Sequence, residues 1–167
     1  FLIISVAALF YGFTQSPSWT SYSEQNLYRD RIIFSTTTPY QHIVLTKSKT
    51  DDLACYINGH LQFNSFDEHI YHENLTHPII NLLNKVNPNP KRILVLGGGD
   101  GLAVRELLKY SSIQEVVLVD LDPEMTRLAQ ENPYFLEINK GSLNSKRTTV
   151  QTTLPKEAKQ TTQEVTL

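Results

Sequence analysis

The segment VLGGGDG, residues 95–101, constrains the fold of this chain more than any other segment. It follows the apolar run RILVL and precedes the helix-like pattern LAVRELLKY, so it predicts a tight turn from a buried strand into a helix. Glycines let a ligand approach such a turn closely, and free N–H groups at the helix start favour an anion. Asp100 nevertheless places a negative charge there. The ligand must therefore suit both a close approach and a carboxylate.

A second strand and a second helix follow the turn. EVVLVDLDP is typical of another buried strand, and EMTRLAQEN of a helix that ends at Pro133. This order predicts a right-handed βαβ unit of a parallel, Rossmann-like sheet, with both strands buried on both faces. Asp120 would then lie beside the turn and accept hydrogen bonds from ribose hydroxyls, while Asp122 caps the following helix. We expect a nucleotide-like ligand in that crevice.

The glycine spacing narrows the class of ligand. The dinucleotide pattern G-x-G-x-x-G fails, because neither Leu102 nor Val104 supplies its last glycine. Gly97, Gly99 and Gly101 instead give G-x-G-x-G, the turn of folds that bind S-adenosylmethionine. A tight turn without any ligand stays open as an alternative at this point.

The residues before the turn indicate a small antiparallel sheet over 32–65. They are rich in β-branched and aromatic side chains, with a polar turn at Lys49–Asp52 and a type I′ hairpin signature at Asn58–Gly59. The segment after the sheet predicts a helix that Asp67 caps and that Pro78 kinks or restarts. Its apolar side consists of Leu75, Ile79, Leu82, Leu83 and Val86.

The first 13 residues, FLIISVAALFYGF, carry no charge. They are too short to span a bilayer, which needs about 20 residues, so we interpret them as the last turns of a transmembrane helix that began upstream. A buried core helix is the alternative. Trp19, Tyr22 and Tyr28 follow and suit a membrane interface. We therefore expect a cell-membrane protein whose catalytic domain is cytoplasmic.

Composition excludes several kinds of partner. A net charge of −2 without a basic cluster argues against nucleic acid. The single cysteine, Cys55, excludes an intrachain disulfide and is expected in the core. His72 and His77 are five residues apart, which turns about 140° around a helix, and His69 with His72 lacks a third ligand. We therefore expect no metal.

Five motifs carry a family resemblance that runs from about Tyr22 to about Leu143. They are TPYQHIVLT, CYINGHLQF, DEHIYHENLTHP, ILVLGGGDGLAVRELLKY and VVLVDLDPEMTRLA. In this order they resemble the spermidine synthase family of polyamine aminopropyltransferases, most closely bacterial members with an N-terminal membrane region. The resemblance implies aminopropyl transfer from decarboxylated S-adenosylmethionine to putrescine, which gives spermidine and methylthioadenosine. Decarboxylated S-adenosylmethionine is then a co-substrate, no prosthetic group is implied, and a homodimer is compatible with the resemblance.

The resemblance implies an α/β fold, in which a small antiparallel sheet precedes a truncated Rossmann-like parallel sheet of the methyltransferase type. We place the end of a transmembrane helix and a linker at residues 1–22, and the β-stranded N-terminal domain at 23–66. The first part of the cofactor-binding domain follows at 67–146, and a disordered tail at 147–167. Family members continue into an adenine-binding acidic motif and a loop with the catalytic aspartate, whereas this tail has no Asp. We therefore expect no catalytic residue here and an inactive fragment.

The resemblance also assigns site residues. Gln41 would contact the methylthioadenosine part of the co-substrate, Asp120 its ribose, and Tyr71 and His72 would line the polyamine channel. The expected cofactor-binding set is thus Gln41, Gly97, Gly99, Asp100, Gly101 and Asp120, and the expected substrate-binding set is Tyr71, His72 and Asp100. Gln62, Asp67 and Glu73 are weaker candidates, because polar residues around a helix start are usually caps and solvated faces.

Asp100 would select the decarboxylated co-substrate. The carboxylate of S-adenosylmethionine itself would be repelled by about 4 kcal/mol at about 4 Å and an effective dielectric constant of about 20. Decarboxylation leaves only a cationic amine, which a charge-assisted hydrogen bond to Asp100 would hold by about 1.5–3 kcal/mol. The alternatives left open are a methyltransferase-like protein that uses S-adenosylmethionine itself, a non-catalytic remnant, and a lipid-associated module.

Overall fold

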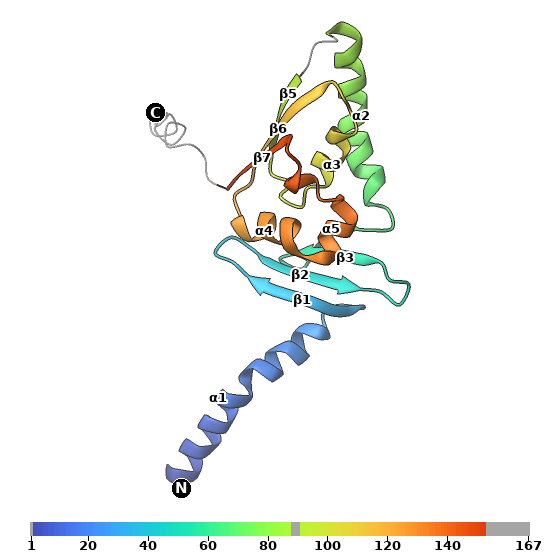
Figure 1. Cartoon of the computed structure of the whole chain (residues 1–167). Coiled ribbons are helices and arrows are strands. Elements are labelled where there is room, and N and C mark those ends of the chain that lie inside the picture. The colour runs from blue at the N-terminus through green and yellow to red at the C-terminus, as the bar shows by residue number, and fades with distance from the viewer. Residues whose placement is uncertain (1, 88–90, 153–167) are drawn as a thin grey trace, which may run out of the picture.

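The computed structural model describes residues 2–87 and 91–152. A long N-terminal helix leads into an antiparallel sheet, and a parallel sheet with its helices follows (Figure 1). This is the α/β arrangement that the sequence predicts. In chain order the elements are α1 (Leu2–Gln25), β1 (Arg31–Thr37), β2 (His42–Lys47), β3 (Leu53–Ile57), β4 (His60–Asn64), α2 (Glu68–Val86), β5 (Lys91–Leu96), α3 (Leu102–Leu108), β6 (Ile113–Val119), α4 (Pro123–Glu131), α5 (Pro133–Asn139), the short 3₁₀ helix Ser142–Asn144 and β7 (Thr148–Gln151).

The antiparallel sheet has the strand order β1-β2-β3-β4. Of its two central strands, β2 is the more buried, and Leu45 of β2 pairs with Cys55 of β3. At the hairpin between β3 and β4, Asn58 has a φ of 52° and Gly59 a φ of 80°. A type I′ turn requires two positive φ values, so the predicted hairpin is confirmed.

Helix α2 differs from the prediction in three ways. It runs without a break through Pro78, and Asp67 at its N-cap position makes no side-chain cap hydrogen bond. Its predicted apolar side is largely the exposed one, since Leu75, Ile79, Leu82 and Val86 are all at least half exposed. The buried stripe is Glu68, His72, Thr76 and Ile80, at a spacing of four residues. Packing of this stripe on both sides of Pro78 explains why the helix continues.

The parallel sheet has the order β5-β6-β7, and α3 connects its first two strands. The predicted βαβ unit is therefore confirmed. Burial of β5 on both faces is wrong, because Leu94 is 60% exposed and Leu96 is 72% exposed. The expected disorder is also wrong for residues 148–151, which form β7 along the open edge of β6. The rest of that predicted tail, from residue 153, lies outside the described residues.

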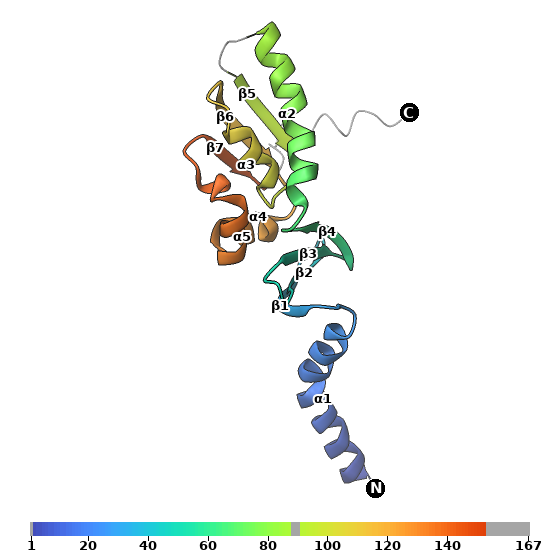
Figure 2. The same ribbon diagram turned by 90° about the vertical axis from the view of Figure 1, so that its right-hand side faces the viewer.

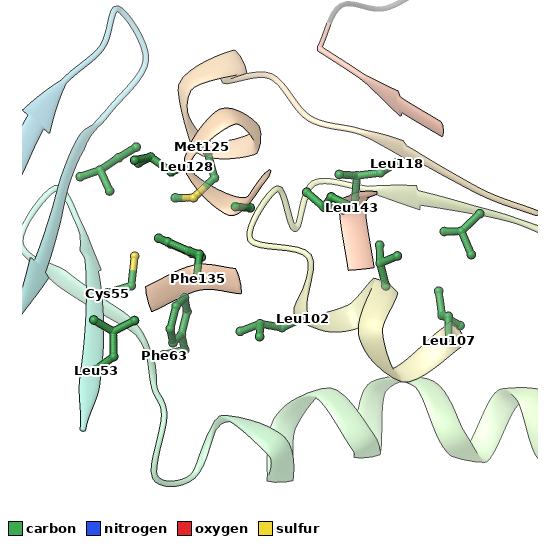
Figure 3. Close-up of a cluster of buried hydrophobic side chains, with 14 of the residues drawn as sticks. Leu53, Cys55, Phe63, Leu102, Leu107, Leu118, Met125, Leu128, Phe135 and Leu143 are labelled. Atoms are coloured by element: carbon green, nitrogen blue, oxygen red, sulfur yellow. The ribbon is translucent and has the colours of Figure 1, made fainter. Parts of the chain in front are cut away.

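Buried side chains from both sheets form one hydrophobic cluster (Figure 3). The rings of Phe63 from β4 and Phe135 from α5 meet edge to face, with centroids 5.8 Å apart. Cys55 is buried beside them, as predicted, and burial raises the pKa of its thiol, so it behaves as an inert core side chain. Full burial of a large apolar side chain such as Phe63 or Phe135 contributes about 1.5–3 kcal/mol to the free energy of folding. The shared core therefore holds the two sheets together.

Helix α1 projects away from the rest of the molecule (Figures 1 and 2). Large apolar side chains along this helix are exposed to solvent, with Ile3 84%, Leu9 75% and Phe13 79% exposed. Its last turn is attached to the antiparallel sheet, where Glu24 Oε1 lies 2.6 Å from His42 Nε2. Among the helices of the described ranges, none combines the length and apolar character needed to cross a bilayer.

Candidate functional site

The turn after β5 has a backbone that only glycine adopts easily. Gly97, Gly98 and Gly101 have φ values of 76°, 72° and 80°. Gly99 is required for a different reason, because a Cβ there would lie 2.8 Å from Asp120 Oδ2. The absence of a side chain at Gly99 therefore leaves room for Asp120 at the end of β6.

Asp120 fills this space at the carboxyl end of β6. Its Oδ2 accepts a hydrogen bond of 2.8 Å from the Gly99 N–H, and its Oδ1 accepts one of 2.9 Å from the Asp122 N–H. The predicted placement beside the turn is confirmed. The proposed contact with a ribose stays a prediction.

Asp100 is half-buried in the turn, two residues before the first residue of α3. Its Oδ1 accepts a hydrogen bond of 2.8 Å from the Leu102 N–H. Burial raises the pKa of the Asp100 carboxyl, and the charges of Asp120 and Glu68 add to the rise. The Leu102 N–H and His72 act in the opposite direction. This carboxylate therefore gains from a cationic ligand more than an exposed one would.

A cavity of about 420 Å³ lies at the turn. It adjoins a second cavity of about 690 Å³, with which it shares Gln62, Phe63, Tyr71, His72 and Leu75. Residues of β4, α2, β5, the turn and α3 line the first one: Gln62, Phe63, Tyr71, His72, Leu75, Val95, Leu96, Gly97, Gly98, Asp100 and Ala103. The predicted substrate-binding residues Tyr71, His72 and Asp100 are thus brought together.

His72 is buried, whereas Tyr71 beside it is 66% exposed. The two rings meet at right angles, with centroids 5.1 Å apart. His72 Nδ1 lies 2.7 Å from the Glu68 carbonyl oxygen and 2.9 Å from Glu68 Oε2. The His72 imidazole is therefore oriented by Glu68, a residue of the same helix α2.

Gln41 reaches the same edge of the parallel sheet from the loop between β1 and β2. Its Nε2 donates a hydrogen bond of 2.7 Å to Asp122 Oδ2, to which Thr38 Oγ1 also donates at 2.9 Å. Asp122 Oδ1 accepts from the Glu124 N–H at the start of α4, so the predicted cap is confirmed. Gln41 and Asp120 do not line the 420 Å³ cavity. They form an adjoining cluster beside the glycine turn.

The weaker candidates are separated in the structure. Gln62 lines both cavities and Asp67 lines the larger one. Glu73 lies elsewhere, where its ligand atoms and those of His77 and Glu106 are within 4.8 Å of one another, a set the sequence argument did not weigh. The ammonium group of Lys109 contacts Glu106 Oε2, so a fixed positive charge already balances this carboxylate. The absence of a metal stays a prediction.

Two residues next to the buried side of His72 were not predicted from the sequence. Glu68 and Arg105 form a bidentate ion pair, with distances of 2.7 Å and 3.0 Å. Glu68 precedes His72 by four residues, so the two share a helix face, and this spacing could have indicated a contact. Arg105 lies 37 residues beyond Glu68, and no local pattern relates them.

Comparison with known proteins identifies the family. The family model described as "Spermine/spermidine synthase domain" matches residues 68–165. Polyamine aminopropyltransferase of Leptospira interrogans is 45% identical over 148 residues, which is 89% of this chain and 29% of that protein. Polyamine aminopropyltransferase 2 of Ralstonia nicotianae is 46% identical over 144 residues, 86% of this chain and 27% of that protein.

Solved structures to which this chain is similar belong to the same kind of protein as these relatives. The crystal structure of spermidine synthase from Thermotoga maritima matches with a TM-score of 0.64 and 28% identity, over 74% of this chain and 40% of that one. A spermidine synthase in complex with the transition state analogue AdoDATO matches with a TM-score of 0.63 and 28% identity, over 72% and 40%. The chain spans less than a third of the two curated relatives. By its family model and its relatives, the chain belongs to the spermine/spermidine synthase family.

Proposed function

We propose that this chain binds the co-substrate of a polyamine aminopropyltransferase and forms part of the binding site for the polyamine substrate. The reaction is aminopropyl transfer from decarboxylated S-adenosylmethionine to putrescine, which gives spermidine and methylthioadenosine. Membership of the family supports this reaction class. The complex of a similar spermidine synthase with AdoDATO, a transition state analogue, supports the kind of ligand.

One observation carries the proposal: the Asp100 carboxylate lines a cavity at a glycine turn built for close approach. A decarboxylated co-substrate has a cationic amine but no carboxylate at its aminopropyl end. Asp100 can accept a charge-assisted hydrogen bond from that amine, whereas it would repel the carboxylate of S-adenosylmethionine. The charge at Asp100 therefore sets the choice of co-substrate.

In the transfer step the lone pair of a putrescine nitrogen attacks the aminopropyl carbon that is bonded to the sulfonium. A C–N bond forms, and the electrons of the breaking C–S bond go to sulfur, which leaves as the neutral thioether methylthioadenosine. The attacking amine must lose a proton, which requires a base. Within the described residues, Asp100 and His72 lie where they can orient the amines of the two substrates.

The test is calorimetric titration of the chain with decarboxylated S-adenosylmethionine and with S-adenosylmethionine. We expect tighter binding of the decarboxylated form, and a loss of about tenfold to a hundredfold of that affinity in Asp100→Asn. The variant should also bind S-adenosylmethionine better than the unchanged chain does.

Asp51→Asn serves as the matched control. Asp51 has a φ of 74°, which Asn tolerates, and an exposed side chain on the turn between β2 and β3. Its replacement should leave both affinities unchanged. Equal affinity of the unchanged chain for the two ligands would overturn the proposal and favour a methyltransferase-like protein.

A further inference from the structure

A buried ion pair lies directly behind His72. Arg105 of α3 donates from Nη1 to Glu68 Oε1 at 2.7 Å and from Nη2 to Glu68 Oε2 at 3.0 Å. The Glu68 side chain is 5% exposed and that of Arg105 is 12% exposed. Little water reaches the pair, so its geometry is firmly held.

The guanidinium group of Arg105 is fixed by further contacts. Its Nε donates to Glu106 Oε1 at 2.8 Å, and Nη1 also donates to the Ile138 carbonyl oxygen of α5 at 2.9 Å. Burial opposes its charge, but the hydrogen bonds to Glu68 and Glu106 leave the pKa of Arg105 above its ordinary value. Arg105 is therefore a permanent cation on α3 that is anchored to α5 and holds Glu68 of α2 in place.

The clamped Glu68 determines which nitrogen of His72 carries a proton. Both partners of Nδ1 are oxygens of Glu68, and a carbonyl oxygen can only accept a hydrogen bond. Nδ1 is therefore protonated, and in the neutral ring Nε2 keeps its lone pair. In the described part of the chain His72 Nε2 makes no hydrogen bond, and His72 lines the cavity that holds Asp100.

We propose that Glu68 and Arg105 are positioning residues, which hold the His72 ring so that Nε2 accepts a hydrogen bond from an amine of the polyamine. This inference rests on the proposed function. A metal-bound histidine is oriented in the same way, by an acceptor on its other nitrogen. Here the neighbour of Nε2 would be a primary amine.

The first measurement is nitrogen NMR of the chain labelled at histidine, with His72 assigned from its loss in His72→Ala. We expect the Nδ1–H tautomer of His72 in the unchanged chain. Glu68→Gln keeps an oxygen acceptor and should keep this tautomer. The double variant Glu68→Leu/Arg105→Met replaces the pair by apolar side chains of similar volume, so neither partner is left as a lone buried charge, and Glu106 keeps the ammonium group of Lys109 as its cationic partner. In it we expect a mixture of tautomers.

The second measurement is putrescine affinity in the presence of methylthioadenosine, with urea unfolding as the check that each variant folds. We expect the double variant to bind putrescine about tenfold more weakly, and Glu68→Gln to keep most of the affinity. In a His72→Ala background the double change should have no further effect.

Two results would overturn the inference: an unaltered tautomer in the folded double variant, or an equal loss of affinity with and without His72. Failure of the proposed function has a different signature. The unchanged chain would then bind no putrescine, while the tautomer of His72 would still respond to the Glu68 and Arg105 variants.

Discussion

Gly99 shows how a missing side chain can position a charged one. The Asp120 carboxylate occupies the space next to Gly99 and accepts its N–H, so turn and strand end are in direct contact. The glycine motif and the spacing to Asp120 were sufficient to predict that Asp120 lies beside the turn, but not that its carboxylate accepts the Gly99 N–H. They act through the local geometry of a βαβ unit, which recurs in many chains.

Replacing Gly99 by Ala should therefore disturb the site at its centre. A Cβ would lie 2.8 Å from Asp120 Oδ2 and 3.0 Å from Met125 Cγ, so the strand end must shift. We expect a loss of about 1–3 kcal/mol in the free energy of unfolding by urea. Gly12→Ala in α1 meets only ring atoms of Trp19, the nearest at 3.9 Å, and should not destabilise the chain. Equal effects of the two changes would contradict this account.

The raised pKa of Asp100 predicts a pH dependence with opposite signs for stability and binding. In the ligand-free chain the raised pKa means that protonation stabilises the fold, and this stabilisation is lost as pH rises through the folded pKa. A cationic amine binds the ionised carboxylate. The affinity of the chain for such an amine should therefore fall on acidification. This fall should begin at a pH above the ordinary aspartate pKa of about 3.9.

Calorimetry with decarboxylated S-adenosylmethionine from about pH 8 down to about pH 5 tests this expectation. The decline should vanish in Asp100→Asn, whose amide does not titrate. A decline of the same size in that variant would assign the titration to another group.

At the scale of elements, Asp122 joins a helix start to the other sheet. One carboxylate oxygen caps α4, and the other accepts hydrogen bonds from Gln41 and Thr38 of the β1–β2 loop. The cap follows from Asp-Pro before a helical pattern, and was predicted. The contact with Gln41 spans 81 residues and has no local signature, so only the structure reveals it.

The two roles of Asp122 can be separated by substitution. Asp122→Asn keeps an oxygen for the cap but turns an amide group toward Gln41 and Thr38, which should cost about 1–2 kcal/mol. Asp122→Ala loses both roles and should cost about 2–4 kcal/mol. Urea unfolding of both variants measures the difference. If Asn destabilises as much as Ala, the hydrogen bonds from the loop carry the whole effect.

Helix α1 is the element for which we propose a lipid environment. Its bare apolar side chains, among them Phe10 at 70% and Phe13 at 79% exposed, are costly in water. We expect the chain to float with liposomes, and a variant without residues 1–18 to remain in the aqueous fraction with better solubility. A full chain that is equally monodisperse without lipid or detergent would contradict this proposal. Localisation at the cell membrane stays a prediction.

Three elements show where sequence patterns misled. On α2 the broad stripe around Leu75 favoured the wrong face, because periodicity counts apolar residues and cannot detect that the buried Glu68 pairs with the distant Arg105 and also binds His72. Helix α4 ends before Pro133, as predicted, but Pro133 also begins α5 with Asn132 as its cap, and that helix was not predicted from the sequence. The Thr-rich strand β7 lacks an apolar pattern and forms because β6 offers an edge.

At the scale of the whole molecule, the chain spans 29% of its Leptospira relative. Among the described residues that line the 420 Å³ cavity, Asp100 is the single carboxylate, and we propose that it binds the cationic end of the co-substrate. We therefore expect the 167 residues to give background release of methylthioadenosine from decarboxylated S-adenosylmethionine and putrescine. Loss of a general base costs about 10²- to 10⁴-fold in rate.

The matched comparison joins the chain to the remaining length of a polyamine aminopropyltransferase relative, which should give robust release in the same assay. Turnover at comparable rates by both proteins would show that a base is present in these 167 residues.

A path of hydrogen bonds runs from Gln41 through Asp122 and Asp120 to Gly99. It joins the loop after β1 to the turn after β5, so we expect the two sheets to open locally as one cooperative unit. A ligand that rests on both ends must be released before either sheet can open alone. Amide hydrogen exchange in β2 and β6 should therefore slow together, by the same factor, as the ligand saturates the chain.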